Sequence, residues 1–265
     1  MKKRAKFKVS LSIFDLPIFM SLDELFARLK ATGIDGVEVV PGVKTRWNLK
    51  NLKKLADKHA LPVFSFHQPL WSVLGWWFDE DFLANISDIG IRKITFHPPA
   101  KYSFNDSSMQ RYLEKLAKLR EKYKLDIFLE NMPPTAGLYI VNKLLPYSLD
   151  VTSPLKIFTA AKEFGLQINL DTSHALSVAP HREKWFEEIY PGIGNIHLSS
   201  FNGKRDHLPL QFGTFKAHEF IQNLVLRGYN GLLTFEINYP KKFNFFRFDF
   251  ESIKKSVEIV KQASV

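Results

Sequence analysis

The chain has 265 residues, no cysteine and a formal net charge of +10 at pH 7. Without cysteine it has no disulfide, no thiolate nucleophile and no cysteine-based zinc site, so a bound metal must take its ligands from histidine, aspartate, glutamate or water. Hydrophobic residues make up 45% and charged residues 24%, which is typical of a globular protein in water. We expect residues 1–265 to form one domain.

The first residues, Met1-Lys2-Lys3-Arg4, have the charge of a secretion signal. Lys6, Lys8 and Asp15 interrupt the apolar run that such a signal needs, so we expect a cytoplasmic protein with no membrane contact. The positive charge has two interpretations. It favours a polyanionic or phosphorylated partner, or it reflects lysines on the solvated faces of outer helices. The lysines are spread along the chain, which favours the second interpretation.

Apolar runs of strand length alternate with helical patterns eight times along the chain. The predicted strands are residues 7–13, 36–40, 62–66, 93–96, 126–129, 167–170, 195–198 and 232–235. The predicted helices include residues 21–31, 48–59, 106–123, 214–226 and 251–262. Ser21 and Glu24 have the spacing of a capping box, and Gly33 stands where the first helix should end. Eight such units in this length predict a closed (β/α)₈ TIM barrel, with a doubly wound open sheet as the alternative.

Side chains that can bind a metal stand at the ends of six consecutive predicted strands. In a parallel barrel these ends meet at one rim, where TIM barrel enzymes carry their active sites. The residues are His67, His97, Glu130, Asp171, His197 and Glu236. The following loops add His174 and His207. Any one of them alone is more often a hydrogen-bonded residue under a loop. Together they predict a divalent metal site, because clustered carboxylates repel one another without a cation.

The segments around these residues, in this order along nearly the whole chain, resemble the xylose isomerase-like barrels. That superfamily includes sugar isomerases and epimerases and the endonuclease IV enzymes of DNA repair, so the resemblance is specific to the fold rather than to one activity. The matching segments are Gly36-Val37-Glu38, Phe66-His67-Gln68-Pro69, Phe96-His97-Pro98-Pro99, Leu129-Glu130-Asn131-Met132, Leu170-Asp171-Thr172-Ser173-His174, Ile196-His197-Leu198, Asp206-His207-Leu208-Pro209 and Phe235-Glu236-Ile237-Asn238.

Resemblance to the epimerase branch implies a sugar or sugar phosphate isomerase or epimerase with one divalent ion, which can be Mn, Co, Zn or Mg. The implied ligands are Glu130, Asp171, His197 and Glu236. The same two glutamates would act as the acid and base on opposite faces of the sugar, through an enediolate. His174 would contact a substrate oxygen. Some ketose epimerases carry a further glutamate where this chain has Ala136, so the substrate stays open.

Resemblance to the endonuclease branch implies up to three zinc ions and hydrolysis of a phosphodiester in abasic-site DNA. In that pattern His67, His97, His174 and His207 would be further metal ligands. Arg46-Trp47 and Leu70-Trp71 lie in loops that such enzymes insert into DNA. The pattern has an aspartate two residues before His207, and this chain has Arg205 there. We therefore prefer the isomerase or epimerase, with the endonuclease-like phosphodiesterase as one alternative and a metal-binding barrel without turnover as another.

Four residues are predicted to contact the substrate: Arg205, Glu38, Trp71 and Asn131. The guanidinium of Arg205 can bind a sugar hydroxyl or a phosphate. Glu38 either points into the barrel mouth or pairs with a basic side chain such as Arg46.

Two aromatic segments, residues 71–78 and 243–250, follow the third and eighth predicted strands. They would either close over a sugar or base, or pack loops onto the barrel and form a dimer contact. We expect a small-molecule partner and a monomer or homodimer.

Overall fold

The structure is a computed structural model. It describes residues 7–13, 20–41, 48–69, 80–100, 102–138, 143–178, 183–237 and 249–264. The following predicted features lie outside these residues: Arg46, Trp47, Leu70, Trp71 and most of the two aromatic segments. No helix in the described ranges is both long enough and apolar enough to cross a lipid bilayer.

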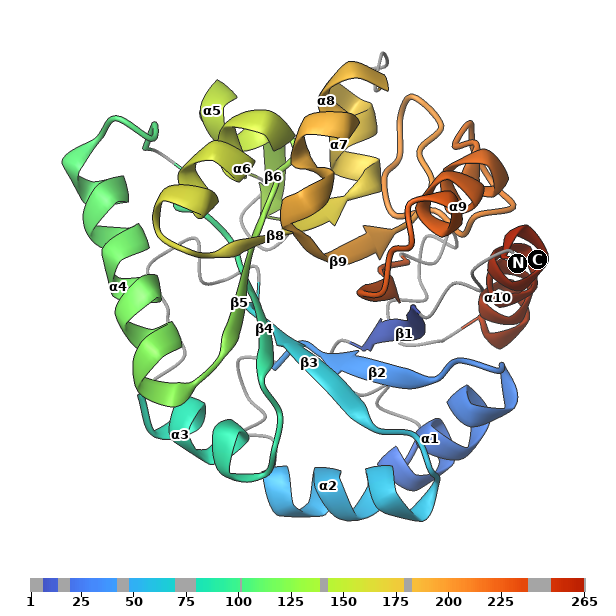
Figure 1. Ribbon diagram of the computed structural model, residues 1–265. Helices are drawn as coiled ribbons and strands as arrows, with labels where there is room; N and C mark the ends of the chain where they lie inside the picture. The colour runs from blue at the N-terminus through green and yellow to red at the C-terminus, as the bar shows by residue number, and fades with distance from the viewer. Residues whose placement is uncertain are drawn as a thin grey trace. The chain divides into compact units, whose positions relative to one another are not determined.

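Eight strands form a closed barrel in the order β1-β10-β9-β8-β5-β4-β3-β2 (Figure 1). Their bounds are β1 Lys8–Ile13, β2 Gly36–Val39, β3 Val63–His67, β4 Lys93–Phe96, β5 Asp126–Glu130, β8 Gln167–Asp171, β9 Ile193–Leu198 and β10 Leu232–Phe235. The predicted (β/α)₈ TIM barrel is confirmed, and each predicted strand end lies within two residues of the observed one.

Helices follow the strands along the chain, as the sequence predicts. They are α1 Leu22–Ala31, α2 Leu49–Lys58, α3 Glu80–Asp88, α4 Ser107–Tyr123, α5 Leu149–Thr152, α6 Pro154–Glu163, α7 Thr172–Val178, α8 Glu183–Ile189, α9 Ala217–Leu226 and α10 Phe250–Ala263. An antiparallel hairpin, β6 Thr135–Leu138 and β7 Lys143–Pro146, follows β5. The 3-10 helix η2, Tyr190–Gly192, precedes β9.

Local sequence accounts for the bounds of the first helix but not for the start of α9. The hydroxyl of Ser21 accepts a hydrogen bond from the backbone N–H of Glu24 at 3.1 Å, as a cap should, and Gly33 follows α1 at φ 86°. Helix α9 begins three residues later than predicted, at Ala217. The hydroxyl of Thr214 donates to the carbonyl of Phe201 at 3.0 Å, so it does not cap a helix there.

The chain divides into two compact units. We call Met1–Phe64 with Ile196–Val265 the first unit and Ser65–Asn195 the second unit. The expectation of one domain over residues 1–265 stays a prediction.

In the first unit, β1 pairs with β2 and with β10 in parallel. The register places Ser12 opposite Glu38. Helix α1 packs on α2, and α9 packs on α10, as Figure 1 shows. The strand residues of β2 are all buried, Glu38 among them.

In the second unit, β3, β4, β5 and β8 pair in parallel. Helices α4 and α6 pack against β5, and α6 and α7 pack against β8. The register places Glu130 opposite Asn169. The last residues of β5 and β8, Glu130 and Asp171, are therefore side chains at the carboxyl end of this sheet, where parallel α/β folds carry their sites.

Candidate metal centre

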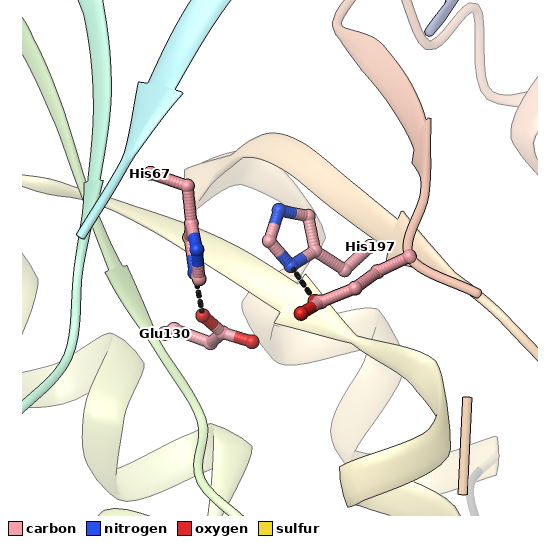
Figure 2. A group of neighbouring side chains, drawn as sticks. His67, Glu130 and His197 are labelled. Carbon is pink, nitrogen blue, oxygen red and sulfur yellow. Dashed lines mark hydrogen bonds and ion pairs between the residues drawn. The ribbon is translucent and has the colours of Figure 1, made fainter. Parts of the chain in front are cut away.

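Three side chains at the ends of β3, β4 and β5 meet in the second unit. The Nε2 atom of His67 lies 2.9 Å from Oε2 of Glu130, and Nε2 of His97 lies 3.1 Å from Nε2 of His67. The same Nε2 of His97 is 3.4 Å from Oε2 of Glu130. All three residues are buried. Figure 2 shows His67 and Glu130 pointing toward one another.

These three distances fit a shared metal ion. Ligands placed 2.0–2.1 Å from a tetrahedral zinc are about 3.3 Å apart. The atoms of His67, His97 and Glu130 are 2.9–3.4 Å apart. Two imidazole Nε2 atoms at 3.1 Å need either a proton between them or a cation that both face. The three atoms are therefore spaced as ligands of one divalent ion would be.

The backbone at the end of β4 is held by two neighbours of this trio. The side chain of Gln68 accepts a hydrogen bond from the N–H of His97 at 2.8 Å. The hydroxyl of Tyr112, on α4, donates to the carbonyl of His97 at 2.5 Å. Burial raises the pKa of Tyr112, so this phenol stays protonated and remains a donor at neutral pH. These contacts fix the direction in which His97 leaves the strand.

Asp171, the last residue of β8, is oriented by the first turn of α7. Its Oδ1 accepts hydrogen bonds from the hydroxyl of Ser173 at 2.9 Å and from the N–H of His174 at 2.7 Å. The amide of Asn131 exchanges two hydrogen bonds with the backbone of Asp171, at 2.8 and 3.1 Å. Asn131 was predicted to contact substrate. In this structure its side chain extends the pairing of β5 with β8 and so positions Asp171.

His174 and His207 share one arrangement. Nδ1 of His174 lies 2.9 Å from the carbonyl oxygen of Asn131, and Nδ1 of His207 lies 3.3 Å from that of Glu236. A carbonyl only accepts, so in each ring Nδ1 carries the proton and Nε2 keeps its lone pair. Histidines that bind metals show the same arrangement. The backbone of His207 is in the left-handed region at φ 49°, a conformation that persists at functional sites.

The first unit contains a chain of three buried side chains. Nε2 of His197, on β9, is 3.0 Å from Oε1 of Glu38 on β2. Its other nitrogen, Nδ1, is 2.6 Å from Oε2 of Glu236, which follows β10. His197 and Glu38 have no exposed surface, and Glu236 is 8% exposed. Figure 2 labels His197 and marks one of its ion pairs. A single imidazole thus lies between two carboxylates.

The candidate metal ligands of each unit are those named from the sequence. Among the described residues, the second unit offers His67, Glu130, Asp171 and His174. The first unit offers His197, His207 and Glu236. Their Asp, Glu and His side chains suit Mn, Co, Zn or Mg. The division of these residues into one or several ion sites stays a prediction.

The remaining predicted substrate residues have different environments. Arg205 is exposed in the loop after β9, where its N–H donates to the side chain of Asn202 at 2.9 Å. Glu38 lies against His197 rather than at an exposed position. Trp71 lies outside the described residues. Their roles toward a substrate stay predictions.

Several residues near the candidate ligands did not stand out in the sequence. Gln68 and Ser173 belong to segments that carry the family resemblance, so their place near the site could have been inferred. Tyr112 and Tyr147 gave no local signal, because one lies on a helix and the other follows a hairpin. The hydroxyl of Tyr147 is buried, and its pKa is raised by burial and by the charge of Glu130.

Comparisons with known proteins agree with this fold. The family model described as xylose isomerase-like TIM barrel matches residues 26–263. The uncharacterized protein MJ1188 of Methanocaldococcus jannaschii is 26% identical over 153 residues, which are 55% of this chain and 52% of that protein. The chain thus spans about half the length of this curated relative.

Two solved structures are similar over nearly their whole length. The 3-keto-D-glucoside 4-epimerase from E. coli has a TM-score of 0.69 at 15% identity and covers 97% of this chain and 100% of its own. The D-allulose 3-epimerase from Methylomonas sp., solved with D-allulose, has a TM-score of 0.70 at 16% identity and covers 97% of both chains. Identities this low establish a shared fold and leave the reaction open. With the family match over most of its length, this chain belongs to the xylose isomerase-like TIM barrel family.

Proposed function

We propose that this protein is a divalent-metal-dependent isomerase or epimerase that acts on a small sugar or sugar phosphate. The observation that carries the proposal is the set of buried imidazoles and carboxylates at the carboxyl ends of the strands, in hydrogen-bonding and ion-pairing contact within each unit. The similar structures named above are sugar epimerases, which supports the choice of substrate class.

The proposed ligands of the ion are Glu130, Asp171, His197 and Glu236. They come from β5, β8, β9 and β10, which follow one another in the strand order of the barrel. Each carboxylate is at most 8% exposed, and carboxylates at this depth are stabilised by a cation. The bound ion would act as a Lewis acid that polarises the carbonyl of a ketose.

Glu130 and Glu236 are the proposed acid and base. One carboxylate removes the proton from the carbon next to the carbonyl, and the other returns a proton to the enediolate from the opposite face. The Glu130 carboxylate is hydrogen-bonded to His67, and the Glu236 carboxylate lies 2.6 Å from Nδ1 of His197 as an ion pair. The lone pair on Nε2 of His174 can accept a hydrogen bond from a substrate hydroxyl. Positioned proton transfer of this kind contributes about 10²- to 10⁴-fold to the rate.

One observation favours a second candidate function, a zinc phosphodiesterase. His67, His97 and Glu130 are spaced as ligands of one ion, and His174 and His207 have the Nδ1 contacts with carbonyl oxygens that are common in metal-binding histidines. Several ions would suit activation of water and clamping of a phosphodiester. Against it, Arg205 stands where that reaction would need an acidic ligand for the third ion, and it is exposed.

Two assays on the same metal-loaded protein separate the candidates. The first follows incorporation of deuterium from D₂O into a panel of ketoses and ketose phosphates, with Mn, Co, Zn or Mg. The second follows incision of a duplex that contains an abasic site. We expect metal-dependent exchange with at least one ketose, no incision, and loss of exchange in Glu236→Gln. Incision without exchange would replace the proposal with the phosphodiesterase, and neither activity with any metal would favour a barrel without turnover.

A further inference from the structure

Glu38 is a charged side chain with no exposed surface, on a fully buried strand of the first unit. It lies on β2, and the register places Ser12 of β1 opposite it. The neighbouring strand residues Val37 and Val39 are buried as well. A carboxylate removed from water at this depth is costly unless polar groups compensate it. The polar group closest to it among the recorded ion pairs is Nε2 of His197, at 3.0 Å.

Nε2 of His197 lies at ion-pair distance from Oε1 of Glu38. A carboxylate can only accept from an imidazole N–H, so this contact favours a proton on Nε2. The ring then has its other nitrogen, Nδ1, on the side of Glu236, 2.6 Å from Oε2. Nδ1 therefore also faces a carboxylate. Because Nδ1 and Oε2 are both atoms that can bind a divalent ion, a bound ion would take the place of a proton on Nδ1, and the proton on Nε2 would remain.

We propose that Glu38 is a positioning residue that orients the imidazole of His197 and keeps the proton on Nε2, so that Nδ1 faces the metal ion together with Glu236. The inference rests on the proposed metal-dependent function, and it gives Glu38 a role other than contact with the substrate. In a histidine that binds a metal through one ring nitrogen, a carboxylate that accepts a hydrogen bond from the other ring nitrogen fixes the ring and raises its basicity. Loss of such a carboxylate weakens metal binding about 10- to 100-fold.

Mn²⁺ affinity, measured by isothermal titration calorimetry on the full chain, tests the proposal. Glu38→Ala removes the acceptor, and we expect Mn²⁺ to bind about 10- to 100-fold more weakly. Glu38→Gln keeps an oxygen that can accept from Nε2, so it should recover part of that loss. Ser12→Ala is the matched control, because it changes a buried side chain opposite Glu38 on the adjacent strand. We expect it to bind Mn²⁺ as the wild type does.

A second measurement does not depend on metal. Because His197 is fully buried, a proton on its Nε2 should exchange slowly and give a resolved nitrogen-correlated proton resonance in the metal-free protein. His197→Asn assigns that resonance by removing it. We expect it in the wild type and in Ser12→Ala, and we expect its loss in Glu38→Ala. Thermal unfolding of the metal-free variants checks that each remains folded.

The outcomes separate this inference from the proposed function. Unchanged Mn²⁺ affinity in Glu38→Ala, or an Nε2 proton that survives in that variant, would overturn the positioning role and leave the metal-dependent reaction standing. A wild type that binds no divalent ion would overturn the proposed function, and the proton resonance alone would then decide whether Glu38 orients His197. Loss of folding in Glu38→Ala moves the test to Glu38→Gln, in which the inference requires a retained Nε2 proton and weaker Mn²⁺ binding than in Ser12→Ala.

Discussion

Removal of divalent metal should lower the thermal stability of this protein by an amount that the linkage relation gives. A ligand that binds only the folded chain, present at 100 times its dissociation constant, stabilises that chain by about 2.7 kcal/mol. The unfolding entropy of a globular protein is about 2.1 cal/mol/K per residue. For 265 residues this amounts to roughly 0.56 kcal/mol/K, so saturating metal should raise Tm by roughly 5 °C.

The assay is thermal unfolding followed by circular dichroism, in a chelator and then in excess Mn, Co, Zn or Mg. Glu236→Gln removes one proposed ligand charge, and its shift should be much smaller than that of the wild type. Glu121→Gln is the control, because the Glu121 side chain is 73% exposed, and it should keep the full shift. Equal shifts in the two variants, or no shift with any of the four metals, would refute the assignment of a buried metal site.

Three further results are expected. Glu130→Gln and Glu236→Gln should each lower turnover by about 10²- to 10⁴-fold, measured by steady-state kinetics on the ketose that reacts. If either variant lost less than tenfold, the glutamate replaced in it would not be the acid or the base. Tyr147→Phe deletes a buried hydroxyl that has no hydrogen-bond partner among the described residues. Urea unfolding should therefore show either no loss of stability or a gain of about 1 kcal/mol. A clear loss of stability would mean that the Tyr147 hydroxyl has a hydrogen-bond partner. The hydrogen bond from Lys156 lowers the pKa of Asp150 in the folded protein below the ordinary value of 3.8. The ionised Asp150 therefore stabilises the fold above pH 3.8, and this stabilisation is lost as the pH falls through the lower pKa of the folded state. The difference in unfolding free energy between wild type and Asp150→Asn should therefore shrink in acid. A difference that grows as the pH falls would contradict the lowered pKa of Asp150.

The eight barrel strands were predictable because each is a short apolar run between helical patterns. The hairpin of β6 and β7 was not, since Thr135-Ala136-Gly137-Leu138 has little strand propensity and β7 ends in a proline. The predicted helix over residues 214–226 began three residues too early, since the hydroxyl of Thr214 binds the distant carbonyl of Phe201 and α9 begins at Ala217. Contacts between residues far apart in the chain decide such details.

The candidate ligands were predictable because strand ends in a parallel barrel share one rim. Their partners were not. Nothing near Glu38 in the sequence indicates that it contacts His197, and nothing near Asn131 indicates that its amide binds the backbone of Asp171. Both pairings depend on strand register and side-chain rotamers, which periodicity does not specify. Tyr112, which donates to the carbonyl of His97, comes from a helix face that looks like ordinary core.

The number and positions of metal ions per chain test the central claim most directly. Anomalous diffraction from crystals grown with Mn²⁺, and separately with Zn²⁺, would measure both. We expect one ion per chain, bound by Glu130, Asp171, His197 and Glu236. Three ions per chain, with His67, His97, His174 and His207 among their ligands, would contradict it and favour hydrolysis of a phosphodiester.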